Sequence, residues 1–292
     1  MSEEVFRQDL DENKAERAGG PFVIELLFRE PADMPSKERM SAVIEKHVGK
    51  TEFFCHDGKT AGFAALDYRA EFQDQSVPVQ LMLTECTAFD GEEIDDFLRS
   101  QMWDCLEERD DILGNCRYRV FATDMLARAL PAVQRATLDM DFLEALSELY
   151  PDCEAFYFPS SGKLFTAESV RQHETEGTNR FIYFGVNVRF FNVQDSEDMV
   201  VDTLGMSTLF LPDLQYHFHG MNPNWVVNHA YNVAAYLLGS GNVIADGETV
   251  DGVVDGEMSS ELHWSCRYED ALIQPPREVL DINMGEYASG TR

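Results

Sequence analysis

The chain has 292 residues, of which 44% are hydrophobic, 11% aromatic and 26% charged, which excludes a coiled coil, a collagen-like fibre and wholesale disorder. Its 53 acidic residues against 23 basic ones give a formal net charge of −30. We therefore expect no nucleic-acid partner, because phosphate binding needs clustered Lys and Arg.

The N-terminus lacks the apolar segment of a signal peptide. The longest apolar stretch, residues 22–28, is interrupted by Glu25 and is too short to span a bilayer. We therefore expect a cytoplasmic protein without a membrane partner. No two of the six cysteines lie within four residues of each other, so we expect free, mostly buried thiols rather than a zinc site.

Residues 1–20 are charged and aperiodic, which predicts a mobile tail. Residues 21–125 form the expected N-terminal half, which opens with a buried strand at 22–28 and a helix capped by Ser36. The further elements expected in this half are strands at 51–55, 62–72, 77–84 and 117–122, and an acidic helix at 91–103 with a stripe of Ile94, Phe97, Leu98 and Met102. The links of hairpin length favour antiparallel pairing.

Residues 126–292 form the expected C-terminal half, which opens with a helix ending before Pro151. Asn222-Pro223 predicts the start of another helix, which ends at Gly239. The other elements expected here are a hairpin at 155–165, a short helix near 167–173, and strands at 181–193, 199–204, 214–218 and 261–268. The fold class is therefore α+β, with mainly antiparallel sheets flanked by helices in two packed halves.

Several short motifs in the second half occur together. They are Leu204-Gly205-Met206-Ser207, Leu211-Pro212-Asp213-Leu214, Asn222-Pro223 with its helix, and Asp246-Gly247-Glu248-Thr249. With the upstream segment at 156–164 and Glu25-Leu26-Leu27, this set resembles the bacterial family of the domain of unknown function 4261, over most of residues 21–274. The resemblance implies a soluble bacterial α+β protein and carries over no catalytic residue. A looser similarity to toxin-immunity and suppressor-of-fused-like domains implies a binding role.

Negative charge is concentrated in two segments. Residues 90–111 hold ten acidic side chains against Arg99 and Arg109, and residues 245–261 hold six acids and no base. One interpretation is solubility or a salt-tolerant host. The sharper hypothesis is that a surface including Glu92, Glu93, Asp95 and Asp96 binds a basic partner protein. Trp225, in the first turn of its helix, would anchor a partner if its indole is exposed.

The candidate chemical site is a His-x-His pair. His217 and His219 would project from one face of a strand, where two imidazoles can bind a transition metal, and His229 and Asp213 are weaker companions. A structural role for these residues is the simpler interpretation, so we expect no metal and no cofactor. The leading hypothesis is a non-enzymatic, immunity-type binding protein, and the alternative is a metal-dependent hydrolase that uses the histidine pair. The sequence does not indicate an oligomeric state.

Overall fold

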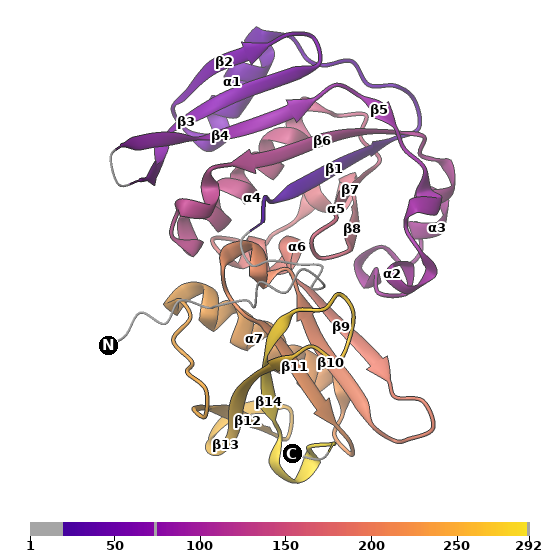
Figure 1. Cartoon of the computed structure of the whole chain (residues 1–292). Coiled ribbons are helices and arrows are strands. Elements are labelled where there is room, and N and C mark those ends of the chain that lie inside the picture. The colour runs from indigo at the N-terminus through magenta and orange to yellow at the C-terminus, as the bar shows by residue number, and fades with distance from the viewer. Residues whose placement is uncertain (1–19, 73–74, 291–292) are drawn as a thin grey trace. The chain divides into compact units, whose positions relative to one another are not determined.

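The computed structural model describes residues 20–72 and 75–290, and the expected tail at 1–20 lies outside this range apart from Gly20. The chain divides into two compact units, Pro21–Gly185 and the residues from Val186 onward (Figure 1). The sequence placed the boundary at 125/126. The segment between these positions belongs to the first unit because its strand β7 pairs with the opening strand β1, with Tyr157 opposite Glu25.

The unit Pro21–Gly185 contains an eight-stranded sheet with the order β2-β3-β4-β6-β1-β7-β8, and its short strand β5 also pairs with β6. Every pair in this sheet is antiparallel. The strands are β1 (Val23–Phe28), β2 (Thr51–His56), β3 (Thr60–Glu71), β4 (Ser76–Thr84), β5 (Thr87–Ala88), β6 (Tyr118–Met125), β7 (Ala155–Phe158) and β8 (Lys163–Thr166).

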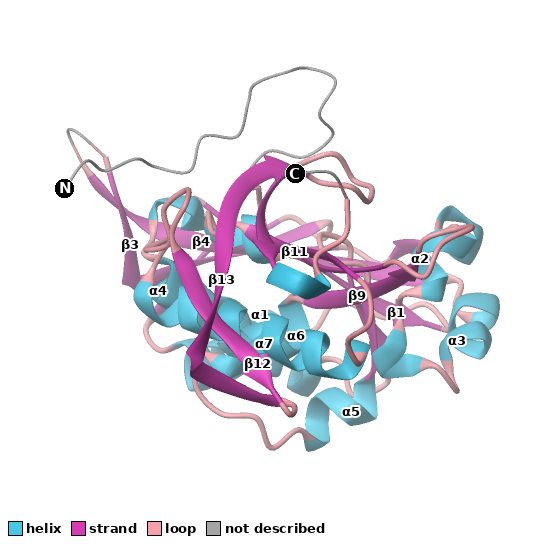
Figure 2. Cartoon of the chain, turned by 90° about the horizontal axis from the view of Figure 1, so that it is seen from below, coloured by secondary structure: helices cyan, strands magenta, loops and turns pink. Residues whose placement is uncertain are grey.

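Two longer helices of this unit, α1 (Lys37–Val48) and α4 (Ala132–Leu149), pack against each other. The hydroxyl of Ser36 accepts a hydrogen bond from the Arg39 amide and caps α1, as predicted. The shorter helices are α2 (Asp96–Ser100), α3 (Arg109–Asn115), α5 (Ala167–Gln172) and α6 (Asn179–Gly185), with 3₁₀ turns η1 (Gly91–Glu93), η2 (Trp103–Cys105) and η3 (Ala127–Ala129). Helices and strands of the chain are distinguished by colour in Figure 2.

The predicted continuous helix at 91–103 is wrong. The structure replaces it with η1, α2 and η2, because two aspartates each start a new turn: Asp90 caps η1 by accepting from the Glu92 amide, and Asp95 caps α2 by accepting from the Leu98 amide. Asp95 therefore has an extended backbone in the middle of the expected helix.

The unit from Val186 onward contains a six-stranded sheet with the order β12-β13-β14-β11-β10-β9. All its pairs are antiparallel except β11 with β14, where Leu214 lies opposite Leu280. The elements are β9 (Asn187–Asn192), β10 (Met199–Leu204), η4 (Met206–Leu209), β11 (Asp213–Phe218), α7 (Pro223–Ser240), β12 (Thr249–Val254), β13 (Glu257–Asp270), β14 (Glu278–Asn283) and η5 (Gly285–Tyr287).

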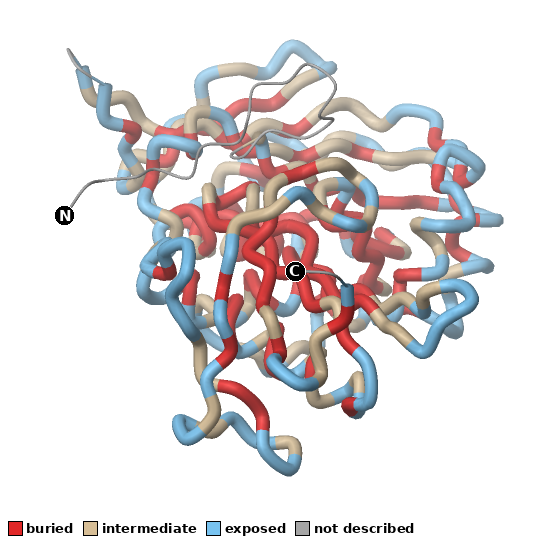
Figure 3. The backbone as a smooth tube through the Cα atoms, turned by 60° about the horizontal axis from the view of Figure 1, so that its bottom comes forward, coloured by how far each residue is buried: buried red, intermediate tan, exposed pale blue. Residues whose placement is uncertain are grey.

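Helix α7 begins at Pro223 with the Asn222 side chain as its cap, as predicted, and packs on β9, β10, β11 and β12. The strand predicted at 181–193 is wrong in its first half, because residues 179–185 form α6. The run Phe181-Ile182-Tyr183-Phe184 is apolar at every position, so a strand period and a helix period fit it equally well. Buried stretches of backbone (red in Figure 3) alternate with exposed turns throughout the described chain.

The α+β class is confirmed, with one antiparallel sheet, one mixed sheet and flanking helices. Within the described residues, no helix combines the length and the apolar character that a membrane span requires. The six cysteines are free thiols, four buried and two partly exposed. Burial raises the pKa of Cys116 to about 11 and that of Cys105 to about 12.

Candidate functional site

The side chain of His217 lies near Asp198, and that of His219 lies near Ser289. The Nε2 of His217 is 3.6 Å from Asp198 Oδ2, and the Nδ1 of His219 is 3.0 Å from Ser289 Oγ. Ser289 in turn donates to Asp198 Oδ1 at 2.8 Å. This order differs from a Ser-His-Asp triad, in which the carboxylate orients the histidine rather than the serine. The two histidines thus help to attach the C-terminal segment around Ser289 to β11 and to the start of β10.

His229 is on the opposite face of the sheet from His217. Its Nδ1 is 2.8 Å from the hydroxyl of Tyr216, and Tyr216 neighbours His217 on β11, so the two side chains point to opposite faces. The other ring nitrogen is 2.7 Å from the Asp251 carbonyl. His229 is 1% exposed, and burial lowers its pKa. It is a core histidine with both nitrogens in hydrogen bonds.

Asp213 belongs to a buried ionic cluster and not to a histidine site. Its Oδ2 is 3.4 Å from Arg277 Nε, and its Oδ1 accepts from Thr203 Oγ1 and the Met206 amide. Arg277 and Arg189 both contact Asp202, at 2.8 and 2.6 Å. Burial raises the pKa of Asp213. The Leu-Pro-Asp motif therefore supplies a residue that holds one end of the six-stranded sheet together.

The structure thus brings together His217 and His219 but places His229 and Asp213 elsewhere. Among residues 20–72 and 75–290, no group of three or more His, Cys, Asp or Glu side chains is arranged to hold a metal ion. The metal-dependent hydrolase therefore gains no support from the positions of its four candidate residues.

The second candidate, the acidic segment 90–111, is fixed locally by its two arginines. Arg99 donates to the carbonyls of Ile94 and Gly91 at 2.8 and 2.7 Å, and Arg109 donates to the carbonyl of Arg99 at 2.8 Å. These guanidinium groups satisfy carbonyl groups that a continuous helix would have paired internally. Arg109 also pairs with Asp110, with 2.9 Å between Nε and Oδ1, so it both shapes the segment and offsets one of its acidic side chains.

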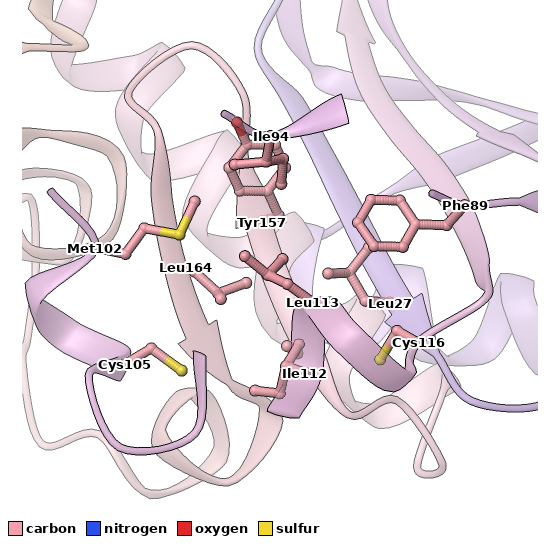
Figure 4. Close-up of a cluster of buried hydrophobic side chains, with 11 residues drawn as sticks. Leu27, Phe89, Ile94, Met102, Cys105, Ile112, Leu113, Cys116, Tyr157 and Leu164 are labelled. Atoms are coloured by element: carbon pink, nitrogen blue, oxygen red, sulfur yellow. The ribbon is translucent and has the colours of Figure 1, made fainter. Parts of the chain in front are cut away.

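A buried cluster attaches the acidic segment to the sheet (Figure 4). Ile94, Met102, Cys105, Ile112 and Leu113 come from the segment and the helix α3 that follows. They pack with Leu27, Tyr157 and Leu164 of the sheet and with Phe89, Cys116 and Ala155. Lys163, 1% exposed, adds an ion pair to Asp104 with 3.1 Å between Nζ and Oδ2. The inner side of the acidic segment is therefore packed against the sheet.

The outer face of the segment carries both acidic and apolar groups. Glu92 and Asp96 are exposed, whereas Glu93 contacts Arg119 at 2.8 Å and Asp95 caps α2. Three large apolar side chains are also exposed: Phe97 at 40%, Trp103 at 45% and Leu106 at 51%. The sequence predicted Phe97 as part of a buried stripe. Because the helix is interrupted at Asp95, the residues after it no longer continue the predicted stripe, and Phe97 faces solvent. The sequence signal that could have revealed the interruption is Asp95 itself, a second helix-capping aspartate five residues after Asp90.

Residues 202–283 match the model of the family described as Domain of unknown function (DUF4261). The resemblance inferred from the motifs is confirmed over that range, which is narrower than the expected 21–274. No curated protein matches the chain, and no solved structure matches it.

Proposed function

We propose that this protein binds a basic partner protein through the acidic surface formed by residues 90–111, as an immunity-type module that catalyses no reaction. The observation that carries the proposal is the combination on one packed segment of ten acidic residues with exposed Phe97, Trp103 and Leu106. Aromatic anchors with a charged surround are characteristic of protein interfaces.

The charge of the surface supports capture of a basic partner rather than solubility alone. Arg99 and Arg109 donate to backbone carbonyls within the segment, while Glu92 and Asp96 remain exposed. Long-range attraction by such a surface raises association rates, and the effect decreases with ionic strength. Apolar side chains supply short-range contacts that salt does not screen.

The experiment identifies the partner and then tests the surface. Proteins captured at low salt from the native host are identified, and the strongest basic candidate is purified for stopped-flow measurement of association rates. The charge-reversal variant is Glu92→Lys with Asp96→Lys, because neither side chain caps a helix. Asp95 is left unchanged since its carboxylate caps α2.

The matched control is Glu45→Lys with Glu52→Lys, which makes the same charge change at exposed positions of the same unit. We expect the surface variant to slow association by about tenfold at low salt and to flatten its salt dependence. The control should change the rate little. Equal rates for both variants, or a partner without a basic surface, would contradict the proposal.

A further inference from the structure

The unit from Val186 onward contains a cavity of about 660 Å³ between α7 and the β12–β13 hairpin, which Figure 2 shows alongside α7. This volume lies in the range typical of ligand sites, about 300–1,000 Å³. The lining shares no residue with the acidic surface 90–111 and lies wholly within the matched family range. The cavity is therefore a second candidate site, and the chemistry of its lining determines which class of ligand it suits.

Two contacts identify the side of α7 that faces the cavity. The Nε2 of His229 is 2.7 Å from the Asp251 carbonyl of β12. Gly256, in the hairpin turn, lies against the Trp225 indole, since a Cβ added to this glycine would be 2.9 Å from the indole nitrogen. Asn232 follows His229 by three residues, so it projects from the same side of the helix. The side chains on this side of α7 therefore face β12 and the turn after it.

Two neutral carboxamides on α7 are available to a ligand. Asn228 and Asn232 both line the cavity and are one helical turn apart, so their Cβ atoms are about 5–6 Å apart. Neither carboxamide hydrogen-bonds to another side chain or backbone group of the described residues. Each offers two N–H donors and a carbonyl acceptor. A purely hydrocarbon ligand would remove these amides from water and leave them unpaired, which is unfavourable.

The carboxylate of Asp251 does not face the cavity. Its Oδ1 is 3.5 Å from the Nδ1 of His263, the residue opposite Asp251 in the β12–β13 pair. The next pair, Val250 with Trp264, points to the other face of the sheet, where the ring centroids of Trp264 and His229 are 4.8 Å apart. Val250, and not Asp251, is therefore directed towards α7.

The other titratable side chains of the lining give no basis for selecting a charged ligand. Glu248 accepts from the Ala245 amide of its own turn at 2.7 Å, and Glu257 is exposed beside the hairpin turn. Both ring nitrogens of His229 are in hydrogen bonds within the protein, and burial lowers its pKa. The described lining includes no Lys or Arg. An anion therefore finds no partner in the lining, and a cation finds only the exposed Glu257.

The rest of the lining includes accessible apolar surface. Tyr236 is 53% exposed, Val243 is 48% exposed and Met258 is 44% exposed. Tyr236 follows Asn232 by four residues, so its ring is next to that carboxamide on the helix surface. Tyr236 and Trp225 both offer flat apolar ring faces. The lining thus suits an uncharged ring that has apolar faces and hydrogen-bonding groups around its edge.

We propose that the cavity between α7 and the β12–β13 hairpin binds a neutral saccharide, with a sugar face on the aromatic side chains and hydroxyl groups on the Asn228 and Asn232 carboxamides. A sugar ring combines the required features, because its hydroxyl groups lie around the edge and its C–H groups lie on the two faces. The site goes beyond the proposed function, because it uses different residues in the other unit.

The test measures binding of maltose and of N,N′-diacetylchitobiose to the full chain by saturation-transfer difference NMR and calorimetry. Both disaccharides are uncharged, and only the second carries acetamido groups, so the tighter one identifies the type of sugar. Cyclohexanol, a ring with one hydroxyl group, is the apolar probe. We expect at least one disaccharide to bind about tenfold more tightly than cyclohexanol. Its affinity should change by less than about twofold between low and high salt, because no ion pair forms.

The variant Asn228→Ala with Asn232→Ala should weaken disaccharide binding by about tenfold, because it removes the hydrogen bonds of both carboxamides. Alanine favours a helix, so the fold should be retained, which circular dichroism checks. The matched control is Asn224→Ala with Ser240→Ala, which removes two exposed polar side chains of α7 outside the lining and should have little effect. No binding of either disaccharide, equal binding of cyclohexanol, a strongly salt-dependent affinity, or an equal loss in the control would overturn the proposal.

Discussion

At the residue scale, one buried guanidinium serves two buried carboxylates in the first unit. Arg135 donates to both oxygens of Asp124, at 2.6 and 3.0 Å, while Asp139 is one helical turn away with its Oδ2 3.8 Å from Arg135 Nε. Burial, and then repulsion from Asp124, raises the pKa of Asp139 well above its usual value. The same burial therefore favours the protonated form of Asp139 over its ionised form.

We expect Asp139→Asn to become more stable than the wild type as pH rises. Because the pKa of Asp139 is higher in the folded state, the wild type loses stability as pH rises through that pKa, and asparagine removes this loss. The gain should reach about 1 kcal/mol or more at the alkaline end. Urea denaturation between about pH 4 and pH 9 measures it.

The control for this prediction is Asp124→Asn, which leaves Arg135 without its bidentate partner. It should cost about 3–5 kcal/mol in the free energy of unfolding. If Asp139→Asn loses as much stability as Asp124→Asn at every pH, then Asp139 is an ionised partner of Arg135 and its pKa is not raised.

At the element scale, the sequence predicted correctly the helices α1 and α7, whose starts carry capping residues, and it missed elements whose ends no such residue marks. Ser36 and Asn222-Pro223 mark the starts of α1 and α7 correctly. The strands β12 and β14 were missed: β12 carries Asp251 and Gly252 in a six-residue run, and β14 is equally short. The packing of β12 against α7 was therefore beyond prediction.

The acidic segment shows the same limit. Its charge was evident from the sequence, but the exposure of Phe97 depends on the break at Asp95. The segment also depends on Gly91, where an added Cβ would lie 2.0 Å from the Leu113 carbonyl oxygen. That contact is with backbone, so it cannot be relieved by turning a side chain.

We therefore expect Gly91→Ala to lower the free energy of unfolding by about 1–3 kcal/mol, because the added methyl group forces η1 away from α3. Gly114→Ala is the control, since a methyl group added there would have nothing within 4 Å and alanine favours a helix by about 0.5–1 kcal/mol. Denaturant melts of both variants measure the difference. Equal stability of the two would show that η1 adjusts freely.

At the scale of the whole molecule, each unit has a sheet and a buried core of its own. In the unit from Val186 onward, Leu214, Tyr216, Val233, Leu237 and Trp264 are almost fully buried. The family match at 202–283 omits β9 and the first half of β10. The omitted residues Met199, Val200 and Val201 of β10 pair with β11. The matched range alone would therefore leave β11 without part of its neighbouring strand.

We expect a fragment of residues 186–292 to unfold cooperatively as a monomer, and a fragment of residues 202–283 to lack a cooperative transition, because the missing strand segments remove ladder hydrogen bonds and apolar cover from β11. A fragment of residues 126–292, which follows the boundary expected from sequence, should aggregate. It would contain β7 without its partner β1, so the buried side chains of Phe156 and Phe158 would be exposed. Size-exclusion chromatography and urea melts followed by circular dichroism distinguish the three. A stable monomer of 126–292 together with an unfolded 186–292 would place the boundary at 125/126 after all.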